Sequence, residues 1–189
     1  MFAAEKGVAL DVVPLDVVGG ENRREPHLTR NPLGTTPVLE LPSGRCFSEA
    51  VAICEYLEEL CPQPALIGTT PEERAETRMW TRRIDLGIAE PMVNGYRAAD
   101  RREMFETRMK LVSPAAAAEL KALARDRVIW LDGRMSELTY VCGERFSMAD
   151  IMLFAFLRFG EDFGQPIPTE AATLRRWYER VKERPSSAA

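Results

Sequence analysis

The pattern of hydrophobic and polar residues changes near residue 70. Before that point, short apolar runs are separated by turns that contain Gly or Pro, a pattern typical of strands and hairpins. Beyond it, apolar residues recur at spacings of three and four, which is typical of amphipathic helices. We therefore predict a mixed α+β domain over residues 1–62, a linker over 63–70 and an all-helical domain over 71–189.

The first residues of the chain are typical of the C-terminal end of a helix. Met1–Lys6 suits the last turns of a helix, and Gly7 suits the left-handed residue that often follows one. The apolar run Val8–Val13 predicts a strand, and because it does not alternate with polar residues we expect a sheet covered on both faces. Residues 19–31 are polar, so we predict a loop with a short helix there and place His27 at the surface.

Residues 31–60, NPLGTTPVLELPSGRCFSEAVAICEYLEEL, carry the strongest local signals of the first domain. A turn at the start of this stretch leads into a strand over residues 38–41, and a Pro-Ser-Gly turn leads back into a second strand at Cys46–Phe47. Pro37 has no N–H to donate to a ladder, so we expect it at the start or the edge of a strand.

A helix is predicted directly after this hairpin. Ser48 suits its N-cap position, because a Ser hydroxyl accepts a backbone N–H of the first turn, and Pro62 ends it. Its core-facing residues are predicted to be Ala50, Ile53, Cys54, Leu57, Leu60 and Cys61.

Thr70 and Pro71 mark the start of the first long helix of the second domain. Thr70 suits the N-cap, Pro71 suits the first helical position, and two Glu residues follow in the first turn. Pro91 predicts a kink or a split in this helix. Its apolar stripe comprises Met79, Trp80, Ile84, Ile88 and Met92. Its charged face either lines a cleft or a dimer seam or is solvated, and comprises Arg74, Arg78, Arg82, Arg83 and Asp85.

Further helices are predicted over residues 103–111 and 114–138. Their core positions are predicted to be Leu120, Leu123, Val128, Leu131 and Met135. Ser147-x-x-Asp150 then predicts a capping box ahead of an apolar helix, and since a cap explains both residues we assign Asp150 no catalytic role. A closing helix is predicted over residues 174–181.

Composition narrows the class of protein. The 189 residues are 46% hydrophobic and 29% charged, as in ordinary globular proteins, and the formal charge of −4 argues against nucleic acid as the main partner. No apolar stretch approaches the roughly eighteen residues of a membrane span, and no signal pattern starts the chain. We therefore predict a cytoplasmic protein without a membrane partner.

The cysteines and the histidine are not spaced as the ligands of a metal site. Cys46, Cys54, Cys61 and Cys142 lack C-x-x-C spacing, and His27 is the single histidine. We therefore predict no metal site. Cys54 and Cys61 lie two helical turns apart, so we interpret them as small apolar residues of the core.

Two motifs resemble the cytosolic glutathione S-transferase family. GTTPVLEL followed by FSEAVAICEYLEE resembles the second half of its thioredoxin-like domain, and YVCGERFSMADIMLFAFL resembles the signature of its helical domain. The resemblance implies an incomplete thioredoxin-like domain followed by an all-helical bundle. It also implies a homodimer that uses glutathione as co-substrate and needs no metal.

The same resemblance implies a glutathione-binding site. In the family, the backbone before a cis-proline pairs with the cysteinyl part of glutathione, a role that falls to Thr36 and Pro37 here. A Glu side chain binds the γ-glutamyl ammonium, which implies Glu49, and the next residue binds its carboxylate, which implies Ala50. The family usually has Ser at this last position, so we expect weaker binding, by about 1.5–3 kcal/mol at most. Three arginines either contact the other end of glutathione or are solvated surface charges, namely Arg23, Arg24 and Arg30.

No residue of this sequence matches the family's thiol-activating residue. In the family, a strand and a loop with a Ser, Tyr or Cys come before the segment that matches Met1–Lys6, and that side chain lowers the pKa of the glutathione thiol. The sequence predicts either that further residues precede Met1 or that this is a short form without the function, and the catalytic residue stays unassigned. Without that strand, Val8–Val13 would expose a sheet edge.

Three functions are open from the sequence. The first is a glutathione transferase that conjugates the glutathione thiolate to a small apolar electrophile, with Met92 and Tyr96 as candidates for the electrophile pocket. The second is a non-catalytic glutathione-binding or protein-interaction module on the same fold. The third is a thiol–disulfide enzyme that uses Cys46 or Cys54, which is disfavoured because neither is predicted at a helix N-terminus.

Overall fold

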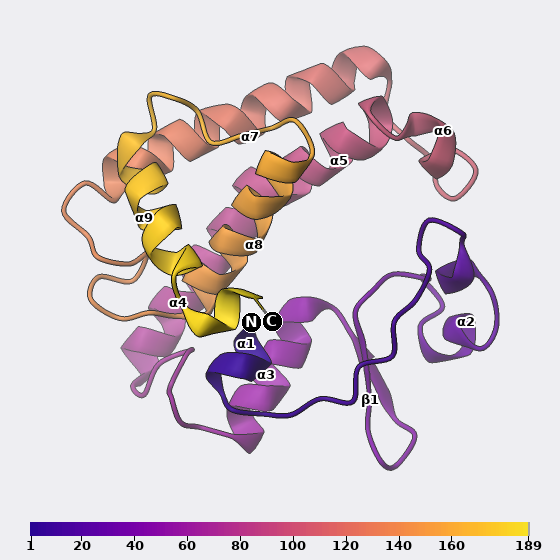
Figure 1. Ribbon diagram of the computed structural model, residues 1–189, viewed down its shortest axis with the longest axis horizontal. Coiled ribbons are helices and arrows are strands. Elements are labelled where there is room, and N and C mark those ends of the chain that lie inside the picture. The colour runs from indigo at the N-terminus through magenta and orange to yellow at the C-terminus, as the bar shows by residue number, and fades with distance from the viewer. Residues whose placement is uncertain (189) are drawn as a thin grey trace. The chain divides into compact units, whose positions relative to one another are not determined.

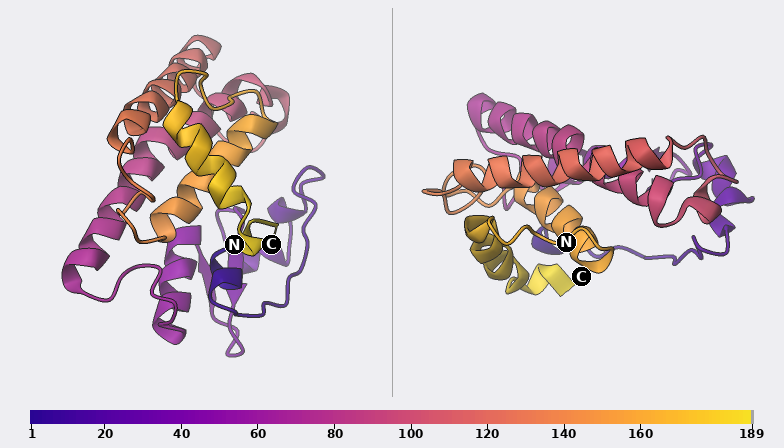
Figure 2. Two further views of the ribbon diagram at one scale, coloured as in Figure 1. Left: turned by 60° about the vertical axis from the view of Figure 1, so that its left-hand side comes forward. Right: turned by 90° about the horizontal axis from the view of Figure 1, so that it is seen from above.

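A computed structural model describes residues 1–188, which form two compact units (Figure 1, Figure 2). The N-terminal unit comprises Phe2–Ala65, and the helical unit begins at Leu66 and includes Met1. The division between the units falls within residues 63–70, the stretch that the sequence suggests as a linker.

The N-terminal unit combines short helices with one antiparallel hairpin. Its elements in chain order are α1 (Phe2–Glu5), the 3₁₀ turn η1 (Glu21–Arg23), α2 (His27–Arg30), β1 (Val38–Glu40), β2 (Cys46–Ser48) and α3 (Ala50–Leu60). The helix end at the start of the chain is confirmed, and Gly7 after it has a left-handed φ of 64°. The loop with a short helix over residues 19–31 is confirmed as well.

The predicted hairpin is present and its register is regular. Val38 lies opposite Ser48 and Glu40 lies opposite Cys46. The turn is closed by the Leu41 N–H, which donates to the Arg45 carbonyl at 2.9 Å. This register decides which residues meet at the open end of the hairpin, where β1 begins and β2 ends.

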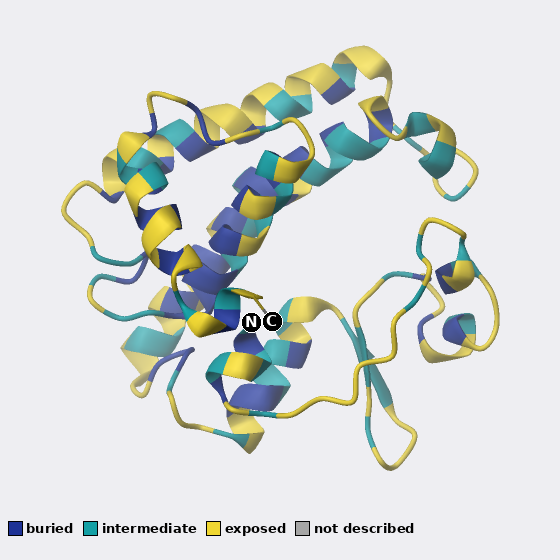
Figure 3. Ribbon diagram, in the orientation of Figure 1, coloured by how far each residue is buried: buried dark blue, intermediate teal, exposed yellow. Residues whose placement is uncertain are grey.

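The strand predicted over residues 8–13 is absent from the described chain. This run is extended and exposed instead, with Val12 and Val13 at 76% and 77% exposure, and Figure 3 shows it largely in yellow. A strand forms only by pairing, and the sheet within residues 1–188 consists of β1 and β2 alone. The prediction of a strand covered on both faces was therefore wrong, because no described strand pairs with this run.

A buried ion pair joins the two ends of the N-terminal unit. The Lys6 ammonium contacts the Glu58 carboxylate of α3, and both side chains are almost fully buried. Lys6 Nζ also donates to the carbonyls of Cys61, at 2.8 Å, and Pro64, at 2.6 Å, just beyond the end of α3. A cation at this end of a helix is favourable because the free carbonyls there carry partial negative charge. Lys6 therefore fixes α1 to α3.

The helical unit has the predicted all-helical character. It consists of α4 (Pro71–Ile84), the π-helical segment η2 (Asp85–Ala89), α5 (Glu90–Ala99), α6 (Arg102–Phe105), α7 (Pro114–Arg134), α8 (Met148–Asp162), α9 (Ala172–Lys182) and the 3₁₀ turn η3 (Pro185–Ala188). α7 packs along α5, and α4 packs against α8 (Figure 1). Within residues 1–188, no helix combines the length and the apolar character needed to cross a membrane.

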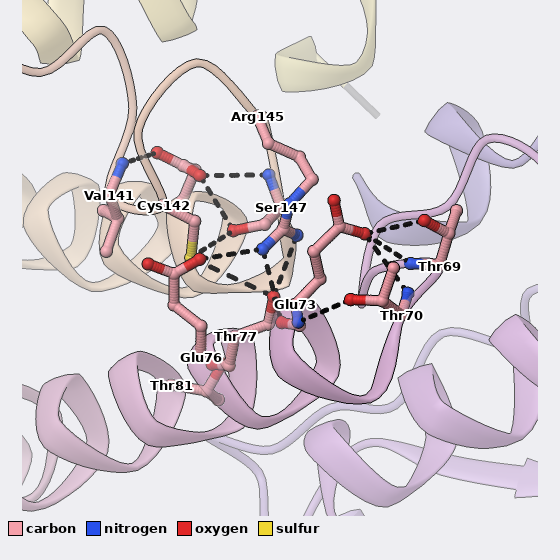
Figure 4. A network of polar contacts seen from close by, with 11 residues as sticks. Thr69, Thr70, Glu73, Glu76, Thr77, Thr81, Val141, Cys142, Arg145 and Ser147 are labelled. Carbon is pink, nitrogen blue, oxygen red and sulfur yellow. Dashed lines mark hydrogen bonds and ion pairs between the residues drawn. The ribbon is translucent and has the colours of Figure 1, made fainter.

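α4 begins where the sequence predicts. The Thr70 hydroxyl accepts the Glu73 backbone N–H at 3.2 Å, and the Glu73 carboxylate accepts the Thr70 N–H at 3.4 Å, which completes a capping box (Figure 4). The helix leaves regular α geometry at η2, just ahead of Pro91. A proline lacks the N–H of the helical ladder and crowds the preceding turn, so the predicted split lies on its N-terminal side.

The core of the helical unit confirms most predicted positions and corrects two. Trp80, Ile84, Ile88, Met92, Val128, Leu131 and Met135 are buried. Met79 and Leu123 are 40% and 59% exposed, although both were predicted to face the core. Adjacent helical residues point in different directions, so Met79 turns outward beside the buried Trp80, and Leu123 turns outward beside Ala124, which is buried although it was not predicted to be.

Asp150 has a structural role at the start of α8, as predicted. Its carboxylate accepts the Ser147 N–H at 3.0 Å, the Val141 N–H at 2.9 Å and the Trp177 indole N–H at 3.1 Å. Burial raises the pKa of the Asp150 carboxyl, although these hydrogen bonds act in the opposite direction. Figure 4 shows the neighbouring contact, in which Arg145 donates to the Thr77 hydroxyl at 2.9 Å.

Candidate functional site

The open end of the β1–β2 hairpin brings together the residues that the sequence singles out. Thr36 and Pro37 lead into β1, and Glu49 and Ala50 follow β2. Because Val38 pairs with Ser48 in an antiparallel ladder, the residues before the one and after the other lie at the same end. All four are exposed, and the Thr36–Pro37 peptide bond is cis. The structure therefore presents one continuous, accessible group of residues.

Glu49 has an unusual backbone conformation. Its φ is 70° and its ψ is 115°, and it is the only non-glycine residue within residues 1–188 with a positive φ. Such a conformation costs about 1–3 kcal/mol and recurs where a side chain must be held in a particular direction. The Glu49 carbonyl accepts the first backbone bond of α3, from the Ile53 N–H at 3.0 Å. The Glu49 side chain thus stands at the junction of β2 and the N-terminus of α3.

This junction corrects the predicted start of the helix. Ser48 belongs to β2 and does not cap the helix, and α3 starts at Ala50 with Glu49 as its N-cap residue. No side chain provides a cap hydrogen bond at this position. The N–H groups of the first helical turn have no partner inside a helix, so the N-terminus of α3 is a favourable place for a carboxylate.

Three buried polar side chains support the loop that precedes Thr36. Asn22 Nδ2 donates to the Gly34 carbonyl at 2.6 Å, Asn31 Nδ2 donates to the Thr35 carbonyl at 3.0 Å, and His27 Nε2 lies 3.0 Å from the same carbonyl. The three side chains are only 3–6% exposed. Buried hydrogen bonds of this kind restrict the backbone, so the loop is held in one conformation up to the residue before the candidate site.

The buried position of His27 contradicts the sequence-based prediction of a surface residue. It is 4% exposed and lies against a carbonyl eight residues further along the chain. The local pattern around Pro26 is polar and contains no sign of that contact. Asn31, in contrast, starts the turn that the sequence predicts, and the Gly34 N–H donates to its carbonyl at 2.8 Å.

The three arginines of this region are engaged with their own chain. Arg23 donates to the Leu33 carbonyl at 2.9 Å, and Arg24 donates to the Gly19 carbonyl at 3.1 Å. Arg30 forms an exposed ion pair of 2.7 Å with Glu40. The structure therefore assigns each of them a contact within the N-terminal unit, and the exposed positions of Arg24 and Arg30 agree with the reading as surface charges.

The thiols of Cys54 and Cys142 are shifted away from the reactive thiolate form. Burial raises the pKa of the Cys54 thiol to about 11, which disfavours the thiolate required for thiol–disulfide chemistry. Burial also raises the pKa of Cys142. Cys46 lies in β2 and is half-buried, away from the N-terminus of α3. Within residues 1–188, no group of three or more His, Cys, Asp or Glu side chains is placed to share a metal ion.

The two residues suggested for an electrophile pocket differ in how deeply they are buried. Met92 is 3% exposed and belongs to the core of the helical unit, so its assignment to an open pocket was wrong. Tyr96 is half-buried, and its ring contacts Phe159 and Phe163 at centroid distances of 5.1 and 4.8 Å. Both were suggested because they are apolar or aromatic residues on a helix. This feature does not distinguish a residue of the core from a residue that lines a pocket.

Comparison with known sequence families identifies the type of domain that each unit represents. Residues 1–60 match the glutathione S-transferase N-terminal domain, and residues 105–185 match the glutathione S-transferase C-terminal domain. The N-terminal unit is accordingly a small thioredoxin-like domain with a two-stranded sheet, and the helical unit is the helical domain that follows it.

Individual relatives agree with these matches. "Glutathione S-transferase 2" of Saccharomyces cerevisiae is 32% identical over 194 residues, which cover 97% of this chain and 79% of that protein. A solved glutathione S-transferase domain-containing protein of Marinobacter aquaeolei is 34% identical, with a TM-score of 0.90 over 98% of this chain and 91% of that chain. A theta class glutathione S-transferase of Xanthomonas axonopodis, solved with glutathione bound, is 26% identical, with a TM-score of 0.79 over 98% of this chain and 86% of that chain. This chain belongs to the glutathione S-transferase family.

Proposed function

We propose that this chain binds glutathione at the open end of the β1–β2 hairpin and conjugates its thiolate to a small apolar electrophile. One observation carries the proposal: the exposed carboxylate of Glu49 stands at the N-terminus of α3, beside the free edge of Thr36 and Pro37. This places a negative charge, a set of backbone donors and an extended edge within one site. Glutathione carries an ammonium, carboxylates and a peptide backbone that match them.

Each of the four residues has a separate role in this proposal. The Glu49 carboxylate pairs with the γ-glutamyl ammonium. The γ-glutamyl carboxylate accepts the Ala50 N–H at the positive end of the α3 dipole. The Thr36 backbone, next to Pro37, pairs with the cysteinyl residue of glutathione as an added strand would. The supported loop at Gly34 and Thr35 keeps this edge in position.

The transfer step forms a carbon–sulfur bond. The glutathione thiol first loses its proton to solvent water, and the thiolate then attacks the electrophilic carbon, where a leaving group departs with the electron pair of its bond. Thiolate, not thiol, is the nucleophile, so activation requires a group that stabilises the thiolate. Thr36, Pro37, Glu49 and Ala50 are assigned to binding and not to this activation.

A calorimetric titration with glutathione tests the site. Glu49→Gln keeps the size of the side chain but removes its charge, and it should weaken binding by about 1.5–3 kcal/mol, which is roughly ten- to hundredfold. The control is Glu137→Gln, which removes an exposed carboxylate of the helical unit and should leave affinity unchanged. Equal affinities for the parent chain and Glu49→Gln would overturn the assignment of Glu49.

Turnover is measured separately, with glutathione and 1-chloro-2,4-dinitrobenzene. Product formation above the uncatalysed rate supports the transferase. Binding without turnover would instead support a non-catalytic glutathione-binding module on the same fold. We further propose a cytoplasmic homodimer, as expected for this family, and sedimentation at several concentrations tests the dimer.

A further inference from the structure

A cavity of about 490 Å³ lies in the helical unit, between α8, α9 and η3. The two long helices that form it pack against each other and are seen side by side in Figure 1. Its volume falls within the range of small-molecule sites, about 300–1,000 Å³. The residues that line it all lie within 154–188, so the cavity shares none with the proposed glutathione site.

Tyr178 of α9 lines this cavity and has a hydroxyl without a partner. The residue is only 6% exposed, and its ring stacks on Phe154 of α8 with the two ring centroids 5.0 Å apart. Within residues 1–188, the hydroxyl makes no hydrogen bond. The polar end of a buried side chain normally has a hydrogen-bond partner, so this hydroxyl is available to a ligand.

The charged groups around this hydroxyl are groups of the cavity wall. Burial raises the pKa of Tyr178, and the Glu161 carboxylate raises it as well. The Arg158 guanidinium lowers this pKa, whereas the carboxylates of Asp162 and Glu179 raise it. All four side chains line the cavity. The hydroxyl therefore lies among them, stays protonated at neutral pH, and stands where three carboxylates favour a cation.

Four of the six charged side chains in the cavity wall are already paired. The Glu161 carboxylate lies 2.9 Å from the Arg175 guanidinium, and the Glu179 carboxylate lies 3.8 Å from the Lys182 ammonium. Each of these pairs joins a cation and an anion of the same wall, so their charges cancel. One cation and one anion of the cavity remain.

These remaining charges are Arg158 and Asp162, both on α8. Neither forms an ion pair in the part of the chain that the structure describes. Arg158 Nη1 donates to the Ser187 carbonyl at 3.0 Å, which leaves the other N–H groups of the guanidinium for a ligand. Asp162 is the last residue of α8, where the free carbonyls carry partial negative charge and a carboxylate is unfavourable. A bound ammonium group would relieve this repulsion.

We propose that the cavity between α8, α9 and η3 binds a small zwitterion, an α-amino acid with an apolar side chain. The ligand ammonium donates to the Asp162 carboxylate and the Tyr178 hydroxyl, and the ligand carboxylate accepts from the Arg158 guanidinium. The apolar side chain lies against the rings of Phe154 and Tyr178. A plain amine or a plain anion would leave one of the two protein charges without a partner, whereas a zwitterion pairs both.

The test is a calorimetric titration of the full chain with L-phenylalanine. Phenethylamine lacks the carboxylate of this probe and 3-phenylpropanoate lacks its ammonium, so both should bind roughly tenfold more weakly or worse. Asp162→Asn and Arg158→Gln each remove one charged partner and should weaken phenylalanine binding by a similar factor. The matched controls are Asp126→Asn on α7 and Arg176→Gln on α9, which are exposed, lie outside the cavity and should bind as the parent does.

Tyr178→Phe tests the hydroxyl by itself. This change keeps the ring that stacks on Phe154, and the hydroxyl that it removes has no partner in the fold, so thermal stability should be preserved. Phenylalanine binding should weaken by about three- to tenfold, because one neutral hydrogen bond is lost.

Several results would overturn the proposal. These are absence of phenylalanine binding, equal binding of phenethylamine, and unchanged affinity in both Asp162→Asn and Arg158→Gln. Glu49→Gln separates this cavity from the proposed glutathione site, which also recognises an ammonium and a carboxylate, and it should leave phenylalanine binding unchanged. A loss of binding in Glu49→Gln with none in Asp162→Asn would place the amino acid at the hairpin and would reject the cavity as its site.

Discussion

The side-chain amide of Asn31 donates to the Thr35 carbonyl at 3.0 Å and to the Thr35 hydroxyl at 2.8 Å. Asn31 is 3% exposed, so water does not replace these bonds easily. Its amide oxygen also accepts the Leu33 N–H at 3.2 Å. One side chain thus fixes both ends of the turn that leads to Thr36, and it couples the stability of this turn to the shape of the proposed glutathione site.

Replacement of Asn31 by Ala should destabilise the N-terminal unit and weaken glutathione binding together. The loss leaves buried backbone groups with fewer partners, at a cost of about 1–3 kcal/mol. Hydrogen exchange of peptides that cover residues 31–41 measures the local effect, and calorimetry measures the affinity. Asn94→Ala on α5 is the control, since it removes a half-buried Asn of the helical unit. Unchanged exchange in residues 31–41 would contradict the positioning role.

Glu49→Gly should lower the affinity for glutathione without lowering the stability of the fold. Glycine adopts a positive φ without the steric cost that Glu49 bears, and this gain of about 1–3 kcal/mol is partly offset by the entropy that glycine loses on folding, about 0.5–1 kcal/mol. The free energy of unfolding should therefore stay level or rise, while glutathione affinity falls. Urea denaturation followed by circular dichroism gives the first quantity. A clear loss of stability would mean that the conformation is not strained.

Ala50→Ser should strengthen glutathione binding. A Ser hydroxyl at this position can donate to the γ-glutamyl carboxylate in addition to the backbone N–H, which is worth about 1.5–3 kcal/mol at most. The side chain is exposed, so the hydroxyl carries no burial cost in the free protein. Calorimetry of the single variant measures the gain. No change in affinity would show that the ligand carboxylate does not reach the N-terminus of α3.

Asp150 should make stability depend on pH in a defined direction. Burial raises the pKa of its carboxyl in the folded state, so the folded protein holds this proton more tightly than the unfolded chain does. The free energy of unfolding should then fall as pH rises from about 4, the ordinary Asp value, through the raised folded value. Asp150→Asn removes this contribution. Denaturation curves of both proteins across this pH range test it, and parallel pH profiles would contradict it.

Several signals that act over a few residues were read correctly from the sequence, although the predicted cap at Ser48 was not. Thr70 and Glu73 cap α4, and Ser147 and Asp150 cap α8, as predicted, because each pair lies within one helical turn. The hairpin around Gly44 was also predicted, since its turn is specified by adjacent residues. These elements need no information from distant parts of the chain.

Features that depend on distant partners were missed. The run over residues 8–13 was predicted as a strand from its composition, but a strand requires a neighbour, and none is described. His27 was placed at the surface because its contact with Thr35 lies outside the local pattern. The N-cap of α3 was set one residue early, at Ser48 and not at Glu49, since the positive φ of Glu49 follows from no propensity of glutamate. The site was located through the family resemblance and not through these local rules.

The exposed run over residues 8–13 also bears on how the protein behaves at high concentration. Val12 and Val13 are largely exposed, and short apolar segments of high β-propensity are those that assemble into intermolecular sheets. Asp11 adds a charge within this run and Pro14 ends it, and both residue types oppose the growth of such a sheet. We therefore expect Asp11 and Pro14 to oppose aggregation through this run, which makes them poor positions for substitution in any engineered form of the chain.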